Sequence, residues 1–348
     1  MSAPLLSVRG LRVGFAARRT GLASPRQWHA AVDSVDLDVA DGQAVGLVGE
    51  SGCGKSTLAR AILALETPAA GRIEWRGKPV RRDDAAVLRG LRREVQVVFQ
   101  DPVGSLDPRM TVGESVTEAL EALAGRQARD AAAARVSATL EEVGLDASLA
   151  IRYPHELSGG QCQRVAIARA IVARPKLLIC DEAVSALDVS VQAQIVNLLA
   201  ELRARHGMAL LFISHNLAVV RHLCEEILVM YLGRIVERAP REVVFTTPRH
   251  PYTRALLASV PIPDPTGAAA RPREPLRTVT DTALPPPTGC AFAPRCAAAD
   301  DFCRGSSPSL VEVGAGEFTA CHHWRTLGPW ASPRSGREHG PLRKTPRE

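Results

Sequence analysis

A glycine-rich stretch at residues 49–57 constrains this chain more than any other feature of its sequence. It reads GESGCGKST, and it keeps the spacing Gly-x-x-x-x-Gly-Lys-Ser. An apolar run at 44–48 precedes it and a run rich in Leu, Ala and Ile follows at 58–65, which predicts a strand, a loop and a helix. In that context the backbone N–H groups at the helix start bind phosphate, and the glycines leave room for it. The chain is therefore expected to bind a nucleotide.

Two residues of this loop each have a specific expected contact. Lys55 should pair with the β- and γ-phosphates, and the Ser56 hydroxyl should bind Mg²⁺. The whole loop is expected to surround the nucleotide: Gly49, Glu50, Ser51, Gly52, Cys53, Gly54, Lys55, Ser56 and Thr57.

Composition narrows the class of protein. The chain has 348 residues, 46% of them apolar, and a formal net charge of +6. No apolar run approaches the ~18 residues that span a bilayer, and the first residues lack the layout of a signal peptide. Arginines cluster without interleaved aromatic residues, so no nucleic acid partner is expected. We expect a cytosolic protein that meets a membrane only through a partner.

The order of apolar runs predicts the organisation of the chain. Strand-like runs at 177–180 and 210–213 flank a helical segment at 191–205, which predicts a parallel sheet covered by helices. Alternating patterns near the N-terminus predict antiparallel strands. The expected parts are a nucleotide-binding domain at 1–258 with a helical subdomain at about 101–165, a Pro-rich linker at 259–287, a small Cys-containing module at 288–326 and a poorly ordered basic tail at 327–348.

Two further motifs provide a pair of acids at a strand end and a helix N-terminus. In LLICDE, an apolar run ends in Asp181 and Glu182, which places both acids at the carboxyl end of a strand, where ligands bind in such sheets. Asp181 is expected to hold Mg²⁺, and Glu182 to accept a proton from the water that attacks the γ-phosphate. The sequence LSGGQ at 157–161 begins a helix and forms a second anion site. Two such sites fit one nucleotide if two copies face each other.

Across residues 5–252 the order of these motifs resembles the ATP-binding subunits of ABC transporters. LSGGQ resembles the family's signature, which gives Ser158, Gly159, Gly160 and Gln161 a role at the ATP of a partner subunit. Gln100, in VVFQDP, resembles the glutamine that contacts Mg²⁺ and joins the core to the helical subdomain. Asp188, in SALD, resembles the dimer-contacting loop, and His215, in FISHN, resembles the switch histidine at the γ-phosphate.

The resemblance implies a fold and a chemistry. It implies a P-loop NTPase cassette of the α/β class, with a RecA-like parallel core, an antiparallel β subdomain and a helical subdomain. It implies an ATPase with Lys55, Gln100, Glu182 and His215 as catalytic residues and ATP with Mg²⁺ as ligands. Phe15 and Trp28 are alternatives for the aromatic residue that stacks on adenine. Ala183 departs from the family, which has proline after the catalytic glutamate.

Longer phrases resemble the dipeptide/oligopeptide, or peptide/nickel, importer subfamily. They include FQDPVGSLDPRMTVGE, YPHELSGGQ and HPYTRALLASVP. The resemblance implies two transmembrane permease subunits, a second ABC ATPase subunit and, indirectly, an extracytoplasmic solute-binding protein. It implies a place at the cytoplasmic face of the inner membrane. Import of nickel, glutathione or an opine is an alternative, as are an exporter and a soluble ABC ATPase that acts on nucleic acid or ribosomes.

Four cysteines near the C-terminus need a separate explanation. Cys290, Cys296, Cys303 and Cys321 follow the spacing Cys-x5-Cys-x6-Cys-x17-Cys, which lacks the close pairs of zinc ribbons. Four thiolates suit a [4Fe–4S] cluster, which some importer ATPases with such a tail carry. A zinc site completed by His322 and His323, or plain packing of the thiols, are the alternatives.

Overall fold

The computed structural model describes residues 3–16, 28–125, 129–185, 187–259, 288–328 and 330. The chain forms two compact units, which divide after Arg238. Apart from residue 259, the predicted linker lies outside the described residues, as does nearly all of the predicted basic tail. None of the described helices is long and apolar enough to cross a membrane.

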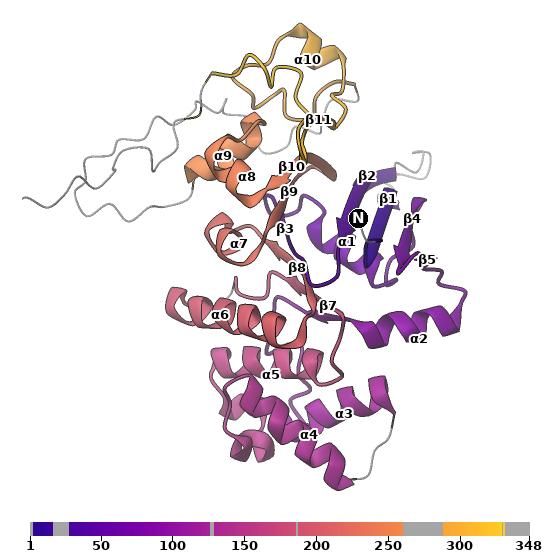
Figure 1. Cartoon of the computed structure of the whole chain (residues 1–348), viewed down its shortest axis with the longest axis vertical. Helices are drawn as coiled ribbons and strands as arrows, with labels where there is room; N and C mark the ends of the chain where they lie inside the picture. Colours follow the sequence, from indigo (N-terminus) through magenta and orange to yellow (C-terminus); the bar gives the residue numbers. More distant parts are fainter. Residues whose placement is uncertain are drawn as a thin grey trace, which may run out of the picture. The chain divides into compact units, whose positions relative to one another are not determined.

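A largely parallel sheet forms the centre of the first unit (Figure 1). Within this unit its strand order is β10-β9-β3-β8-β7-β6. Its strands are β3 (Ala44–Val48), β6 (Val95–Val98), β7 (Leu177–Asp181), β8 (Ala209–Ser214), β9 (Glu226–Tyr231) and β10 (Arg234–Pro240). Every residue of β3, β7 and β8 is buried, which explains why these strands appear in the sequence as continuous apolar runs. The predicted parallel sheet is confirmed.

An antiparallel sheet accompanies the parallel one within this unit. Its order is β2-β1-β4-β5. Its strands are β1 (Leu6–Ala16), β2 (Trp28–Val39), β4 (Ala70–Trp75) and β5 (Lys78–Pro79). Helix α1 (Lys55–Ile62) contacts β1 and β2 on one side and β7 on the other, so it joins the two sheets. The helix that follows the glycine loop therefore lies inside the core of the unit.

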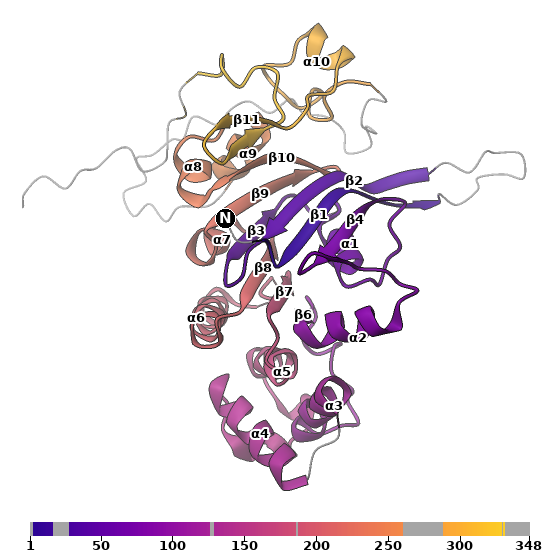
Figure 2. The same cartoon turned by 45° about the vertical axis from the view of Figure 1, so that its right-hand side comes forward.

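Helices cover the rest of the first unit, and α3, α4 and α5 gather at one of its ends (Figures 1 and 2). Thr111 and Ser158 form capping boxes at the starts of α3 and α5. The helices are α2 (Ala85–Glu94), α3 (Val112–Ala124), α4 (Arg129–Glu142), α5 (Gly159–Ile171), α6 (Val189–His206) and α7 (Leu217–Leu223), with 3₁₀ turns η1 (Ala147–Ile151) and η2 (Pro154–Glu156).

The second unit has an aromatic core of its own. It contains helices α8 (Arg241–Thr246), α9 (Pro251–Ser259) and α10 (Asp301–Gly305), and the antiparallel strands β11 (Val311–Gly314) and β12 (Glu317–Thr319). The rings of Tyr252 and His250 lie 5.5 and 5.7 Å from that of Phe292. Burial lowers the pKa of His250 to about 3, so this imidazole is neutral. The cysteine-bearing residues therefore share their core with α9.

Packing of the central strand makes a testable contribution to stability. Leu211 in β8 is 0% exposed and lies between Val45 and Ile179 of the neighbouring strands. We expect Leu211→Ala to lower the free energy of unfolding by about 2–5 kcal/mol, because it leaves a cavity in close-packed core. The matched control is Ile151→Ala at a position 77% exposed, with an expected change of at most about 0.5 kcal/mol. Urea denaturation of both variants measures the difference, and equal values would contradict this packing.

Candidate functional site

The glycine loop has a backbone that only glycine fits at two positions. Gly54 precedes α1 with φ +109°, and a Cβ there would lie 2.0 Å from the carbonyl oxygen of Ala31. At Gly49 a Cβ would lie 2.2 Å from the carbonyl oxygen of Met230. No side chain caps the start of α1. Its first N–H groups are thus left for an anion, and the helix dipole adds to the attraction.

Lys55 is held beneath this loop. Lys55 is only 3% exposed, and its Nζ donates hydrogen bonds to the carbonyl oxygens of Gly49 and Glu50, each at 2.9 Å. The same Nζ lies 3.7 Å from Oε1 of Glu182. A buried ammonium group needs such partners, and a bound phosphate would supply stronger ones.

Ser56 and Asp181 meet, as the sequence predicted for two magnesium ligands. The Ser56 hydroxyl donates to Oδ1 of Asp181 at 2.9 Å. Burial raises the pKa of Asp181, and the hydrogen bond from Ser56 opposes that shift. A hydroxyl beside a buried carboxylate is an oxygen donor set that fits Mg²⁺, whose charge would hold Asp181 ionised. Gln100, the third predicted ligand, is exposed, and no hydrogen bond among the described residues joins it to this pair.

Glu182 and His215 lie at the ends of neighbouring strands. Glu182 follows β7 with φ +50°, a conformation that an L-residue adopts at a cost, and its N–H donates to the carbonyl oxygen of Ile213 at 3.0 Å. Nδ1 of His215 is 3.6 Å from Oε2 of Glu182. The Glu182 carboxylate therefore lies between Lys55 and His215, where it can accept a proton from a water molecule beside the γ-phosphate.

The signature residues lie at a helix start and are not bonded to the glycine loop among the described residues. Ser158 caps α5: its hydroxyl accepts from the N–H of Gln161 at 3.3 Å, while its own N–H donates to Oε1 of Gln161 at 2.9 Å. Gly159 is exposed and has open space where a Cβ would be. Among the described residues no hydrogen bond or ion pair joins residues 158–161 to residues 49–57. Asp188, at the start of α6, has no side-chain cap bond.

The two candidate adenine-stacking residues lie at the same end of the hairpin formed by β1 and β2, on opposite faces of it. Ala16 pairs with Trp28 and Phe15 with His29 where β1 and β2 meet, and both aromatic side chains are exposed. The Arg12 guanidinium lies over the Trp28 ring at 5.3 Å. Since Ala31 on β2 touches the loop at Gly54, this part of the hairpin is close to the phosphate site. Both residues remain candidates.

The four C-terminal cysteines occupy the second unit. Cys296 and Cys303 are buried, and Cys290 and Cys321 are half-buried. Burial is the largest influence on the thiol pKa of Cys321 and raises it to about 12, with smaller contributions from the other three cysteines. A ligand atom from each of Asp300, Cys303 and His323 lies within 4.8 Å of the others. Asp300 was not foreseen as a possible ligand; its position before a short helix is typical of a helix cap, which it also forms.

Comparison with known proteins identifies the family of this chain. Residues 32–185 match the ABC transporter family model, and residues 236–303 match the oligopeptide/dipeptide transporter C-terminal region. The chain is 50% identical over 295 residues to the "Probable peptide ABC transporter ATP-binding protein y4tS" of Sinorhizobium fredii, an alignment that covers 84% of this chain and 82% of the relative. It is 46% identical to the oligopeptide transport ATP-binding protein OppF of Escherichia coli over 308 residues, 88% and 92% of the two chains.

The chain belongs to the ABC transporter ATP-binding subunits. The family predicted from the motifs is thereby confirmed, and with it the ATPase activity.

Solved structures agree on the cassette fold. The cbiO1 subunit of an ABC transporter complex from Clostridium perfringens has a TM-score of 0.60 at 28% identity, over 70% of this chain and 91% of that one. The ATP-binding cassette MJ0796, solved as a dimer bound to ADP and Pi, has a TM-score of 0.60 at 27% identity, over 68% and 98%. The predicted P-loop NTPase cassette is confirmed.

The position of Glu182 generates a prediction about turnover. Glu182→Gln should lower kcat for ATP hydrolysis by about 100-fold or more, because an amide cannot accept the proton. Its affinity for ATP should stay near that of the wild type, whereas Lys55→Ala should weaken ATP binding by about tenfold or more. Single-turnover hydrolysis and equilibrium nucleotide binding measure the two effects. Near-normal hydrolysis by Glu182→Gln would show that another group takes the proton.

Proposed function

We propose that this ATPase subunit powers a peptide importer. The observation that carries the proposal is the meeting of Lys55, Ser56, Asp181, Glu182 and His215 at one edge of the parallel sheet. That arrangement supplies the machinery for ATP hydrolysis. The transport direction and the cargo are supported by the relatives, which are named for peptide and oligopeptide transport, and by the match of residues 236–303.

The proposed roles of the residues follow from their positions. The loop N–H groups and Lys55 would bind the phosphates, while Ser56, Asp181 and Gln100 would hold Mg²⁺. Mg²⁺ neutralises charge on the phosphates and orients them. Glu182 takes the proton of the attacking water, and His215 contacts the γ-phosphate. Phe15 or Trp28 covers the adenine.

A second ABC ATPase subunit completes each site. Among the described residues, the signature of one chain makes no hydrogen bond or ion pair with its own loop, and Ser158 and Gly159 are exposed. In a facing pair, Ser158, Gly159, Gly160 and Gln161 would cap the ATP bound to the other subunit, and Asp188 would lie at the contact. The dimeric form in which the MJ0796 cassette was solved supports this arrangement.

The same function implies a membrane setting. Closure of the ATPase pair would drive two permease subunits, which receive cargo from an extracytoplasmic solute-binding protein. The chain would then lie at the cytoplasmic face of the membrane, held there by the permease. The helical subdomain, which includes α3 and α4, would transmit the motion.

Gly159 offers a test of the shared site. Gly159→Asp should fold and bind ATP as the wild type does, because the position is open and an acid suits a helix start. It should nevertheless lower ATPase kcat by about 100-fold, since its carboxylate would face the γ-phosphate of the partner. Gly159→Ala is the matched control and should stay within about threefold. The readouts are ATPase activity and uptake of a labelled tripeptide by cells that lack the native chain.

Two outcomes would contradict the proposal. Wild-type ATPase activity in Gly159→Asp would exclude the facing pair. Normal peptide uptake in cells that lack the chain, combined with loss of nickel or glutathione uptake, would assign another cargo.

We further propose that Cys290, Cys296, Cys303 and Cys321 bind a [4Fe–4S] cluster. Support comes from the donor set: the Cys290 N–H donates to the carbonyl oxygen of Cys303 at 2.7 Å, and the other three cysteines each contribute to the raised thiol pKa of Cys321. The backbone N–H groups of Phe292 and Ala293 point to Cys290 and that of His323 to Cys321, as around cluster thiolates. Burial raises the pKa of the Cys290, Cys303 and Cys321 thiols, so a metal would have to replace their protons. The cluster would be structural or regulatory.

Colour and metal content test this second proposal. Anaerobically purified protein should be brown, with broad absorption near about 400 nm, and Cys296→Ser should lose both the colour and the iron. Cys162→Ser is the matched control, because Cys162 is buried in the first unit. Colourless anaerobic protein without iron would end the cluster proposal. Bound zinc that is lost in His323→Ala would instead assign the Asp300, Cys303 and His323 group.

A further inference from the structure

A partly buried charge cluster lies where α4, α5 and α6 meet. Nη1 of Arg174 donates to Oε2 of Glu142 at 2.7 Å, and Nη2 contacts Oε1, so the pair is bidentate. Nε2 of His206 is 3.2 Å from the same Oε2, and Nη1 of Arg174 is 2.9 Å from Nδ1 of His206 and also contacts Nε2. The side chains of Glu142 and His206 are 16% and 13% exposed. We call these three residues the junction cluster.

The three residues come from different parts of the ATPase. Glu142 is the last residue of α4, in the helical subdomain. His206 is the last residue of α6, which packs on the core. Arg174 lies between α5 and β7, so the helix before it starts at the signature and the strand after it ends at Asp181. The junction cluster therefore ties the helical subdomain, the signature helix and the catalytic strand together at one point.

The backbone of Arg174 adopts an unusual conformation. Its φ is +56°, in the left-handed region that favours glycine, and its N–H donates to the carbonyl oxygen of Ile171 at 2.8 Å. An arginine in this conformation persists only where its surroundings hold it. The two-pronged bond to Glu142 and the contact with His206 are the contacts that do so.

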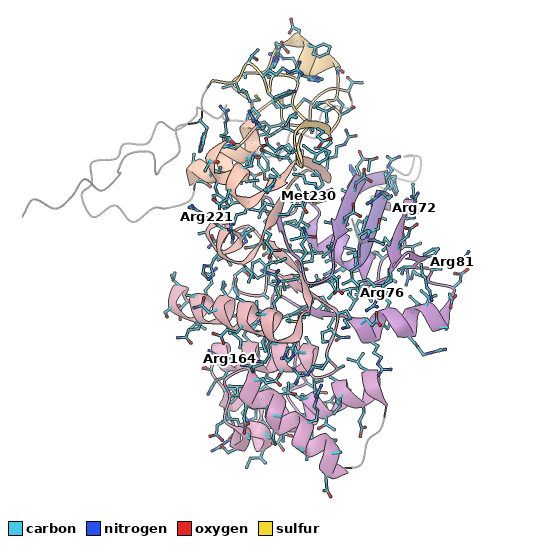
Figure 3. All side chains as sticks on the ribbon, viewed as in Figure 1. Arg72, Arg76, Arg81, Arg164, Arg221 and Met230 are labelled. Carbon is cyan, nitrogen blue, oxygen red and sulfur yellow. The ribbon has the colours of Figure 1, made fainter. Side chains whose placement is uncertain are left out.

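Two further arginines reinforce the same junction. Arg135 of α4 donates to the carbonyl oxygen of Val172, which caps the end of α5, at 3.0 and 3.1 Å. Arg164 of α5, labelled in Figure 3, donates to the carbonyl oxygen of Val143 at 2.6 Å and to Oε1 of Gln194 in α6 at 3.3 Å. Helices α4, α5 and α6 are thus joined through arginine side chains.

We propose that Glu142, Arg174 and His206 position the signature for catalysis, by holding the end of the signature helix and the end of α4 together against the core. Arg174 is the centre of this arrangement and acts as a positioning residue, since it does not touch the ATP site. The inference rests on the proposed function, because a signature acts only on the ATP of a facing subunit.

The protonation state of His206 affects the bonds within the junction cluster. Its geometry suits a neutral imidazole, because a protonated ring would place a second positive charge beside the Arg174 guanidinium, 2.9 Å from Nδ1. Burial, and then the charge of Arg174, lower the pKa of His206; Arg205 adds to this, and Glu142 opposes it. Hydrogen bonds from Arg174 lower the pKa of Glu142 most, so it stays ionised, and Arg135 faces the same pair.

The sign of the pH effect follows. A histidine whose pKa is lowered on folding contributes stability above its ordinary pKa, and that stability is lost as the pH falls below about 6.5. The junction cluster should therefore loosen in mild acid. His206→Gln keeps a donor and an acceptor but cannot be protonated in this range, so it should lack this part of the acid response.

Substitution of Arg174 tests the proposal in the full chain. Arg174→Ala should lower ATPase kcat by about tenfold while ATP affinity stays within about twofold, because the loop that binds ATP is not part of the junction cluster. Arg174→Gly should be impaired to a similar degree, although glycine accepts the left-handed backbone, and Arg174→Lys should recover part of the activity. Arg81→Ala is the matched control, since it removes an exposed ion pair, with Asp83, elsewhere on the same unit.

The pH profile supplies an independent readout. Between pH 7.5 and 5.5 the wild type should lose more kcat than His206→Gln does. Wild-type kcat in both Arg174→Ala and Arg174→Gly, or superimposable pH profiles of wild type and His206→Gln, would overturn the proposal. A parallel loss of ATP affinity and kcat would also overturn it, since that pattern means general damage. Failure of the facing pair is distinguished by Gly159→Asp, whose defect does not depend on the junction cluster.

Discussion

The rest of this cassette depends on the interactions of the buried Lys55 ammonium group. It lies where β3, β8 and β7 end side by side; two loop carbonyls accept its hydrogen bonds, and the Glu182 carboxylate supplies an opposite charge at 3.7 Å. A charge this deeply buried would be costly without those partners. Strand order in the parallel sheet is what brings them together, since the glycine loop, His215 and the acids each follow a different strand. The loop itself is shaped by the carbonyls of Ala31 and Met230, so β2 and β9 also contribute.

Much of this site could be predicted because its signals are local. An apolar run that ends in two acids determines where β7 stops, and a serine before two glycines indicates where α5 begins. Both positions follow from propensity and capping, which operate over a few residues. The order of such local motifs along the chain then predicted the family, the cassette fold and the ATPase. The individual roles of the residues stay predictions until variants are measured.

Features that depend on distant residues could not be read in the same way. Helix α2 was not foreseen, because only Leu91 of its ten residues is buried and arginines dominate the rest. The contact of Tyr252 and His250 with Phe292 joins segments about forty residues apart in sequence, so α9 was assigned to the first domain. The junction cluster likewise joins the ends of α4 and α6 to the loop after α5, and in the sequence each of its three charged residues looks like an ordinary surface residue. The choice between Phe15 and Trp28 stays open because both lie at the same end of one hairpin.

The thirteen residues of α5 connect two kinds of chemistry. One end presents the signature serine, and the chain leaving the other end runs into β7, which ends in Asp181 and is followed by Glu182. At about 1.5 Å per residue the helix is a rod of roughly 20 Å. In a facing pair, the signature end would report on the neighbour's nucleotide and the strand end on the chain's own. The nucleotides bound at the two sites would then be coupled through two such helices, so a change in occupancy at one site would change the forces on the helix that leads to the other.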